Sequence, residues 1–225
     1  MSNKPVSTAK RGRRSKARKF YETGPAWTGG APPYKIGNES TLAMGQLVLT
    51  ALPDRRGFPD FPEAPLVLAD KKSHRPLRDL EACHDFWLIS ERAKQVLERV
   101  DPEAFTFVKC EVRFATGEPG PDYWFCDVVR VLDALDEAES RFRVISSSPK
   151  RKSYHFVSLA FREDAVGSAR IFRMSQQLSD IICDQSVKDA CKTAGLKGFR
   201  FKDATDLWGI GKHAARQYQS QEATP

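Results

Sequence analysis

Four carboxylates within seven residues are the best candidates for chemistry in the sequence: Asp133, Asp136, Glu137 and Glu139. Paired carboxylates can hold a cation together, or can divide acid and base roles through separated pKa values. The stretch lies between an expected strand that ends at Leu132 and another that begins at Arg141, so a solvated turn is the favoured interpretation. Carboxylates on such a loop could also enter a basic active-site cleft of another protein, where their charge would steer binding and add specificity.

The histidines and cysteines are not spaced like metal ligands or disulfide partners. Only Cys83 and His84 bring two such residues close in sequence, and adjacent residues on a strand point to opposite faces, so this pair is a poor chelate. His155 lies in an alternating stretch, where we expect a hydrogen-bonded, half-buried side chain. The cysteines are odd in number and lack a Cys-x-x-Cys pair, and we expect most of them in the core: Cys83, Cys110, Cys126, Cys183 and Cys191.

Motifs of the common enzyme classes are missing from the sequence. No Gly-x-Gly-x-x-Gly follows a strand, and no phosphate-binding Gly-Lys-Ser/Thr, His-Glu-x-x-His or Gly-x-Ser-x-Gly is present. The signature of the zinc deaminases is also missing. We therefore expect a binding protein rather than an enzyme, with no catalytic, cofactor-binding or metal-ligating residues. A hydrolase that uses Asp133 and Asp136 is the enzymatic alternative.

Positive charge is concentrated at the amino terminus. The 225-residue chain has a formal net charge of +7, but residues 1–19 hold eight lysines and arginines and no acid, which leaves the other 206 residues at −1. This segment lacks a periodic apolar pattern, so we expect a disordered basic arm on a neutral body. An alternative function is a nucleic-acid-associated protein that docks through phosphate contacts of the arm, made by Lys10, Arg11, Arg13, Arg14, Lys16, Arg18 and Lys19.

The composition is that of a soluble globular protein. Hydrophobic residues make up 40% and charged residues 29% of the chain. No apolar run approaches the ~18 residues of a membrane span, and the amino terminus lacks the apolar core of a secretory signal. We expect no membrane partner and a cytoplasmic location.

The elements that would position these residues differ between the two parts of the chain. Residues 20–85 are rich in proline and glycine, which predicts a wrapping segment with short strands at Leu47–Leu49 and Leu66–Leu68. Residues 86–211 form the expected core of one domain, 20–211. A polar tail, 212–225, follows it.

Two strand–cap–helix units frame the core. The first is a strand at Phe86–Ile89 and a helix capped by Ser90, with apolar residues at positions i, i+3, i+4 and i+7. The second is a strand at Asp180–Cys183 and a helix capped by Asp184 or Ser186, ended by Gly195. Further strands are expected at Thr106–Phe114, Tyr123–Leu132, Phe142–Ile145, Tyr154–Phe161 and Gly198–Phe201. This order predicts an α+β fold: a mixed, mostly antiparallel sheet with two covering helices and a Pro/Gly-rich N-terminal wrapping segment.

Short motifs in a defined order resemble the immunity-eleven family of bacterial polymorphic toxin systems, from about Phe86 to Gly209. A helix opened by Ser-Glu is followed by an aromatic strand, an Asp-x-x-Asp stretch with a later serine, a Phe-Arg pair and a closing Gly-x-x-Gly-x-x-Phe. These motifs correspond to Ser90-Glu91, Tyr123-Trp124-Phe125, Asp133 to Asp136 with Ser140, Phe172-Arg173, and Gly195, Gly198 and Phe201. The basic arm lies outside this pattern, and Cys183-Asp184 replaces a hydroxyl-capped helix start.

The resemblance implies a protein that binds a cognate toxin and blocks it, with no catalytic residue to carry across. Tight protein inhibitors depend on a few aromatic anchors and on complementary charge. The predicted toxin-binding residues are therefore Trp124, Trp208, Asp133, Asp136, Glu137 and Glu139. The oligomeric state stays open.

Overall fold

The computed structural model describes residues 18–27, 31–46, 49, 56–70, 73, 75–148 and 151–209. Of the expected strand Leu47–Leu49, only Leu49 lies among them. His74, His213 and the arm residues up to position 17 are outside the described residues, as is the chain from position 210 onward.

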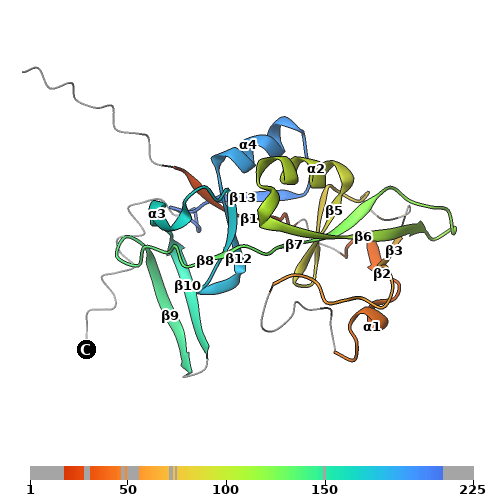
Figure 1. The fold of residues 1–225 in the computed structure, drawn as a ribbon, viewed down its shortest axis with the longest axis horizontal. Coiled ribbons are helices and arrows are strands. Elements are labelled where there is room, and N and C mark those ends of the chain that lie inside the picture. Colours follow the sequence, from red (N-terminus) through yellow and green to blue (C-terminus); the bar gives the residue numbers. More distant parts are fainter. Residues whose placement is uncertain are drawn as a thin grey trace, which may run out of the picture.

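The middle of the chain forms a six-stranded sheet with the order β2-β3-β6-β7-β5-β4 (Figure 1). Its strands are β2 (Tyr34–Ile36), β3 (Leu66–Ala69), β4 (Leu80–Cys83), β5 (Phe86–Ser90), β6 (Phe105–Phe114) and β7 (Tyr123–Val128). Strands β3 and β6 are parallel, and the other neighbours are antiparallel. The strands predicted at Leu66–Leu68, Phe86–Ile89 and Thr106–Phe114 are confirmed.

Both ends of the described chain meet in a five-stranded sheet with the order β13-β1-β12-β11-β8. Its strands are β1 (Phe20–Pro25), β8 (Val131–Leu132), β11 (Ile171–Met174), β12 (Gln177–Asp184) and β13 (Phe199–Asp203). The first strand, β1, is antiparallel to β12 on one side and to β13 on the other. An N-terminal strand is thus inserted between two C-terminal ones.

A separate hairpin extends from the body. It consists of β9 (Arg141–Ser148) and β10 (Arg151–Ser158), which are antiparallel and, within the described chain, pair only with each other. Figure 1 shows it pointing away from both sheets. Val144 and Ile145 are consecutive on β9 and both are exposed, so both faces of the hairpin meet solvent there.

The predicted α+β class with mixed, mostly antiparallel strands is confirmed, but two details of the sequence interpretation are wrong. The strands form two sheets and a hairpin where we expected one sheet. The strand expected at Tyr123–Leu132 is broken, because the chain crosses from β7 to β8 at positions 129 and 130. The Val129 N–H donates to the carbonyl of Ala104, next to β6 of the six-stranded sheet, at 2.8 Å. The following Arg130 carbonyl instead accepts from the N–H of Arg173, on β11 of the five-stranded sheet, at 2.8 Å.

Four α-helices lie within the described residues: α1 (Glu39–Leu42), α2 (Glu91–Val100), α3 (Glu163–Val166) and α4 (Gln185–Thr193). The two longer ones begin as predicted. The Ser90 hydroxyl accepts from the Ala93 N–H at 3.2 Å, and the Asp184 carboxylate accepts from the Ser186 N–H at 2.9 Å. These bonds satisfy amide groups that have no partner within a first helical turn.

Helices α2 and α4 lie side by side over the junction of the two sheets (Figure 1). They bury Ala93 and Leu97 from α2, and Val187 and Cys191 from α4. These side chains share one apolar core with residues from both sheets, including Trp87 and Ile89 of β5 and Ile181 and Cys183 of β12. The two helices thus pack against both sheets, whereas the sequence predicted that they cover a single sheet.

A buried ion pair also joins the sheets. Asp127 of β7 is fully buried, and its Oδ1 accepts from Nη2 of Arg173, on β11, at 2.8 Å. The same carboxylate accepts from the Gly57 N–H at 2.7 Å and from Nε of Arg56 at 3.1 Å. Arg173 also donates to the Val128 carbonyl at 2.8 Å. Burial lowers the pKa of Arg173 and Asp127 raises it, leaving the pKa below its ordinary value.

Two further carboxylates form hydrogen bonds that connect the two ends of α2 to other parts of the chain. Asp101, at the C-terminal end of the helix, accepts from the Arg170 N–H at 2.7 Å and is paired with Arg130. Asp79 accepts from the Ser90 hydroxyl at 2.7 Å and from the Lys197 N–H at 2.8 Å. Each of them links a segment near α2 to one near the five-stranded sheet.

Replacement of the central carboxylate is expected to destabilise the whole fold. Asp127→Ala leaves the buried Arg173 and the half-buried Arg56 without their carboxylate, and loss of a buried partner typically costs about 3–5 kcal/mol. The measurement is the free energy of unfolding from urea titration. Asp133→Ala, which removes an exposed carboxylate, is the control and should change it by less than about 0.5 kcal/mol. Equal effects of the two substitutions would contradict this role of Asp127.

Candidate partner-binding site

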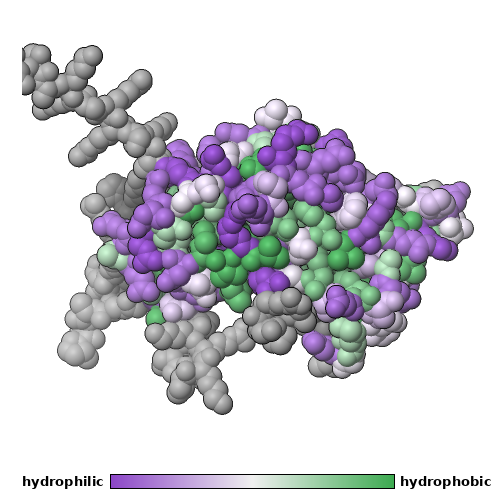
Figure 2. Space-filling model, viewed as in Figure 1, coloured by the Kyte–Doolittle hydropathy of each residue, from purple (hydrophilic) through white to green (hydrophobic). Residues whose placement is uncertain are grey.

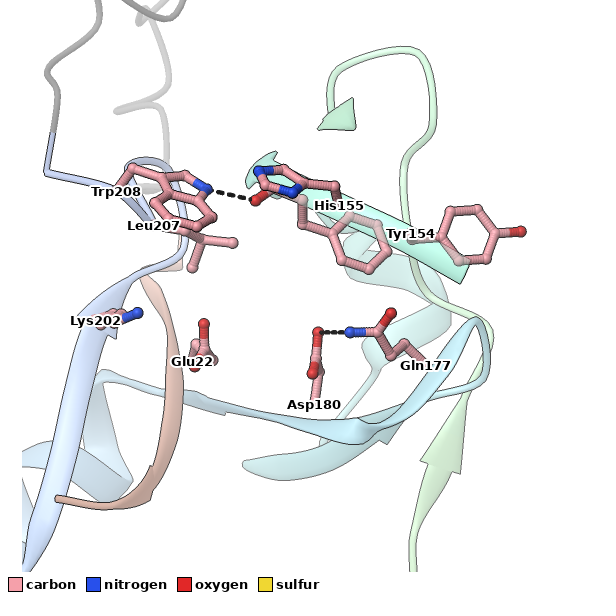
Figure 3. A pocket seen from close by; sticks show the side chains of 9 residues that line it. Glu22, Tyr154, His155, Gln177, Asp180, Lys202, Leu207 and Trp208 are labelled. Atoms are coloured by element: carbon pink, nitrogen blue, oxygen red, sulfur yellow. Dashed lines mark hydrogen bonds between the residues drawn. The ribbon is translucent and has the colours of Figure 1, made fainter. Parts of the chain in front are cut away.

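A pocket with a volume of about 220 Å³ opens between the hairpin and the five-stranded sheet. Figure 3 shows the side chains that line it coming from the hairpin strand β10, from β1, β12 and β13, and from the segment that follows β13; the Tyr154 ring points away from the others. The lining residues are Glu22, Tyr154, His155, Phe156, Gln177, Asp180, Lys202, Leu207 and Trp208. It therefore exists only because distant parts of the chain meet.

One wall of the pocket is an aromatic pair. The Trp208 ring stacks on the His155 ring with 4.9 Å between centroids and 2° between planes. Its indole Nε1 donates to the Phe156 carbonyl at 2.8 Å, and the neighbouring Leu207 N–H donates to the Val157 carbonyl at 3.1 Å. Trp208 is nevertheless 57% exposed. The structure thus presents a large aromatic surface in a fixed orientation, and the expected half-buried state of His155 is confirmed.

The opposite wall is polar. Asp180 is half-buried, and its two oxygens accept from Nε2 of Gln177 at 3.0 Å and from the Ser179 hydroxyl at 3.1 Å. Burial raises the pKa of Asp180, and these two hydrogen bonds lower it only in part. Glu22 and Lys202 are direct partners across β1 and β13, and Glu22 is paired with Arg200.

The acidic loop, Asp133 to Glu139, contacts the turn between β11 and β12, and this turn leads into the pocket. Asp133 accepts from Nε2 of Gln176 at 2.7 Å, and Gln176 precedes the pocket residue Gln177. Asp136 is half-buried, and its Oδ1 accepts from the N–H groups of Ala138 and Glu139 at 3.1 and 3.2 Å. This carboxylate shapes the turn, whereas those of Asp133, Glu137 and Glu139 are exposed. The favoured interpretation, a solvated turn, is confirmed.

The four tryptophans of the chain lie in different environments. Trp124 is half-buried on β7 beside α2, where its Nε1 donates to Glu91 at 2.6 Å and the Lys94 ammonium lies 4.7 Å from the ring centroid. It does not line the pocket that Trp208 lines. Trp87 is buried in the core, and Trp27 is 88% exposed.

The basic arm touches the body at its last residues. Arg18 donates to the Gly167 carbonyl at 2.8 Å and to the Asp184 carboxylate at 2.9 Å. Burial alone would raise the pKa of Asp184, but hydrogen bonds from Ser186, Arg18 and Arg170 hold it below its ordinary value. Lys19 is exposed, and the other residues proposed for nucleic-acid contact lie outside the described chain.

All five cysteines are buried, where we expected most of them in the core. Burial raises the pKa of Cys83, Cys110 and Cys191 to about 12. Among the residues that the structure describes, no group of three or more His, Cys, Asp or Glu side chains could hold a metal ion. In that same part of the chain, no helix has the length and apolar character needed to cross a bilayer.

Asp180, Glu22 and Gln177 were not identified from the sequence. They come from strands at opposite ends of the chain, and none belongs to a motif, so only the pairing of β1 with β12 and β13 brings them together. The one available signal was a polar side chain, Asp180, at the start of an otherwise apolar strand segment.

The pKa of Asp180 predicts how its replacement changes stability. The unfolded carboxyl titrates near 3.8, whereas the folded one keeps its proton to higher pH. Ionisation therefore costs stability as the pH rises through the folded pKa. Asp180→Asn should be more stable than the wild type at pH 7, and the difference should shrink as the pH falls toward 3.8.

Urea unfolding across this pH range is the measurement, and Asp203→Asn is the matched control. Burial would raise the pKa of Asp203, but hydrogen bonds from Thr205 hold it below its ordinary value. Its replacement should therefore lower stability at pH 7, the opposite sign. A stability difference for Asp180→Asn that does not vary with pH would rule out this account.

Most of the chain matches the model of a known protein family. The family model described as Immunity protein family (Imm11) matches residues 19–206, which includes the pocket residues of β1, β10, β12 and β13. No curated protein matches the chain. The match begins well before Phe86, so the proline- and glycine-rich segment is part of the family pattern. The resemblance seen in the sequence is confirmed: the chain belongs to the Immunity protein family (Imm11).

Proposed function

We propose that this protein binds a cognate secreted bacterial toxin in the cytoplasm and neutralises it by stoichiometric inhibition, without catalysis. Membership of the immunity protein family is the observation that carries this proposal. The pocket and the acidic loop supply a surface with the chemistry of a protein interface.

Trp208 is suited to anchor such a complex. Exposed tryptophans often provide a large part of the binding energy at protein interfaces. The stacking on His155 and the bond to the Phe156 carbonyl already fix this ring, so its ordering costs little on binding. Trp124 is a second proposed contact, from the six-stranded sheet.

Apolar surface lies near the same region. Val131 of β8 and Leu178 of β12 are both exposed. Val131 is the register partner of Arg173 in the neighbouring strand, and the Leu178 carbonyl accepts a hydrogen bond from the Arg173 side chain. Figure 2 shows that, on the side of the molecule viewed in Figure 1, apolar side chains gather in the middle with hydrophilic side chains around them. An apolar centre with a polar rim is the usual composition of a specific interface.

The proposal predicts a stable complex with the toxin. We expect the full chain to co-purify in equal amounts with the product of the reading frame immediately upstream, and to restore growth of cells that express that product. Trp208→Ala should weaken binding at least tenfold, as is common for a central aromatic residue. Trp27→Ala removes another exposed tryptophan and is the control.

Two outcomes would contradict the proposal. One is protection of cells at a ratio far below one antidote per toxin, which would indicate an enzyme. The other is protection without any detectable complex. Removal of residues 1–17 should leave protection intact, because the proposed contacts lie on the body.

The acidic loop is proposed to accelerate association. Glu137→Gln with Glu139→Gln should lower the association rate by roughly threefold or more at low salt, and should reduce the dependence of that rate on salt, because steering acts over long range. The dissociation rate should change little. Glu103→Gln with Asp164→Asn removes the same charge elsewhere and is the control. A loss confined to the dissociation rate would show that the loop does not steer.

A further inference from the structure

We infer that the pocket between Asp180 and Trp208 receives an arginine side chain of the partner. This inference rests on the proposed function and names the chemistry of one contact within it. Three observations support it: an unusual carboxylate, the opposite aromatic wall and the size of the space.

Asp180 differs from the buried carboxylates of the same protein. Within the described residues, these are each held by at least one arginine: Asp127 by Arg56 and Arg173, Glu81 by Arg75 and Arg78, Asp101 by Arg130, and Asp184 by Arg18 and Arg170. The described chain brings no arginine, lysine or histidine within ion-pair distance of Asp180, and its two hydrogen-bond donors, Gln177 and Ser179, are neutral. Arg200 is near enough to lower the pKa of Asp180, but its guanidinium is paired with Glu22.

The titration of Asp180 agrees with this difference. Burial would raise the pKa of Glu81, but hydrogen bonds from Arg75 and Arg78 hold it below its ordinary value. The pKa of Asp180 instead stays above its ordinary value, because burial and the nearby Glu22 carboxylate outweigh its two neutral donors and the more distant Arg200. A cation in the pocket would supply the compensation that the other carboxylates already have.

The shape and the aromatic wall favour a guanidinium group. Figure 3 shows Asp180 on one side of the space, with the His155 and Trp208 rings on the other. A planar guanidinium presents donors at its edge and a face that packs against aromatic rings, so it can meet both walls at once. A cavity of about 220 Å³ is large enough for such a group. A compact ammonium would use the carboxylate but not the flat surface.

The other ionisable groups that line the pocket do not compete with Asp180 for the guanidinium group. Glu22 is already paired with Arg200, at 2.5 Å. Lys202 is exposed at the edge of the pocket, so its ammonium can remain in water when the pocket is filled. His155 is engaged with Trp208.

The first test uses a small probe and the full-length protein. N-acetylarginine amide is titrated while the indole N–H signal of Trp208 is followed by NMR, with Trp208→Phe used to assign that signal. We expect a saturable shift with the arginine probe and none with N-acetylcitrulline amide, which has the same shape without the charge. Asp180→Asn should abolish the shift. Equal responses to both probes would indicate a site for neutral planar groups, and no response to either would also overturn the inference.

The second test uses the toxin complex. Asp180→Asn should weaken binding of the upstream gene product by about tenfold or more, because a partly buried charge pair loses its carboxylate. Glu103→Gln, with the same change in net charge outside the pocket, should bind as the wild type does. Wild-type protein that fails to bind the toxin would count against the proposed function itself. Wild-type binding that Asp180→Asn leaves unchanged would overturn the arginine pocket alone.

Discussion

The ion pair between Asp127 and Arg173 is the constraint on which the arrangement of this protein depends. It connects the central strand β7 of one sheet to β11 of the other, in a place that solvent does not reach. A buried pair of this kind adds little net stability compared with apolar residues, but it strongly disfavours arrangements in which either charge lacks its partner. Together with Asp101 and Asp79 it fixes how the sheets meet, and the junction under α2 and α4 follows from that.

The pocket is a consequence of this junction and of the hairpin anchored beside it. Its polar wall comes from the five-stranded sheet, whereas its aromatic wall is attached to β10 through Trp208. A surface assembled in this way from hydrogen-bonded strands would require little ordering if a partner bound to it, as we propose. This suits an immunity protein, whose family implies recognition of a toxin.

Local structure was predictable from the sequence, and long-range assembly was not. The helices at Glu91–Val100 and Gln185–Thr193, with their caps, follow from apolar spacing and from side chains that bond free amides, both of which act within a few residues. The break between Val128 and Val131 could not be predicted, because both sides have strand-like residues and the crossing depends on partners at Ala104 and Arg173. Asp180 and Glu22 were missed for the same reason. Trp208 and the loop at Asp133 were identified by residue type alone, and their roles in binding stay predictions.

The position of β1 between β12 and β13 determines how late in synthesis the five-stranded sheet can form. The strands of the six-stranded sheet lie between Tyr34 and Val128, so they leave the ribosome early and pair over moderate distances along the chain. Strand β1 must wait for partners that are translated more than 150 residues later. Contacts of such long sequence separation slow folding. Because Glu22 and Lys202 face the pocket from β1 and β13, a nascent chain cannot complete this pocket until β13 has emerged.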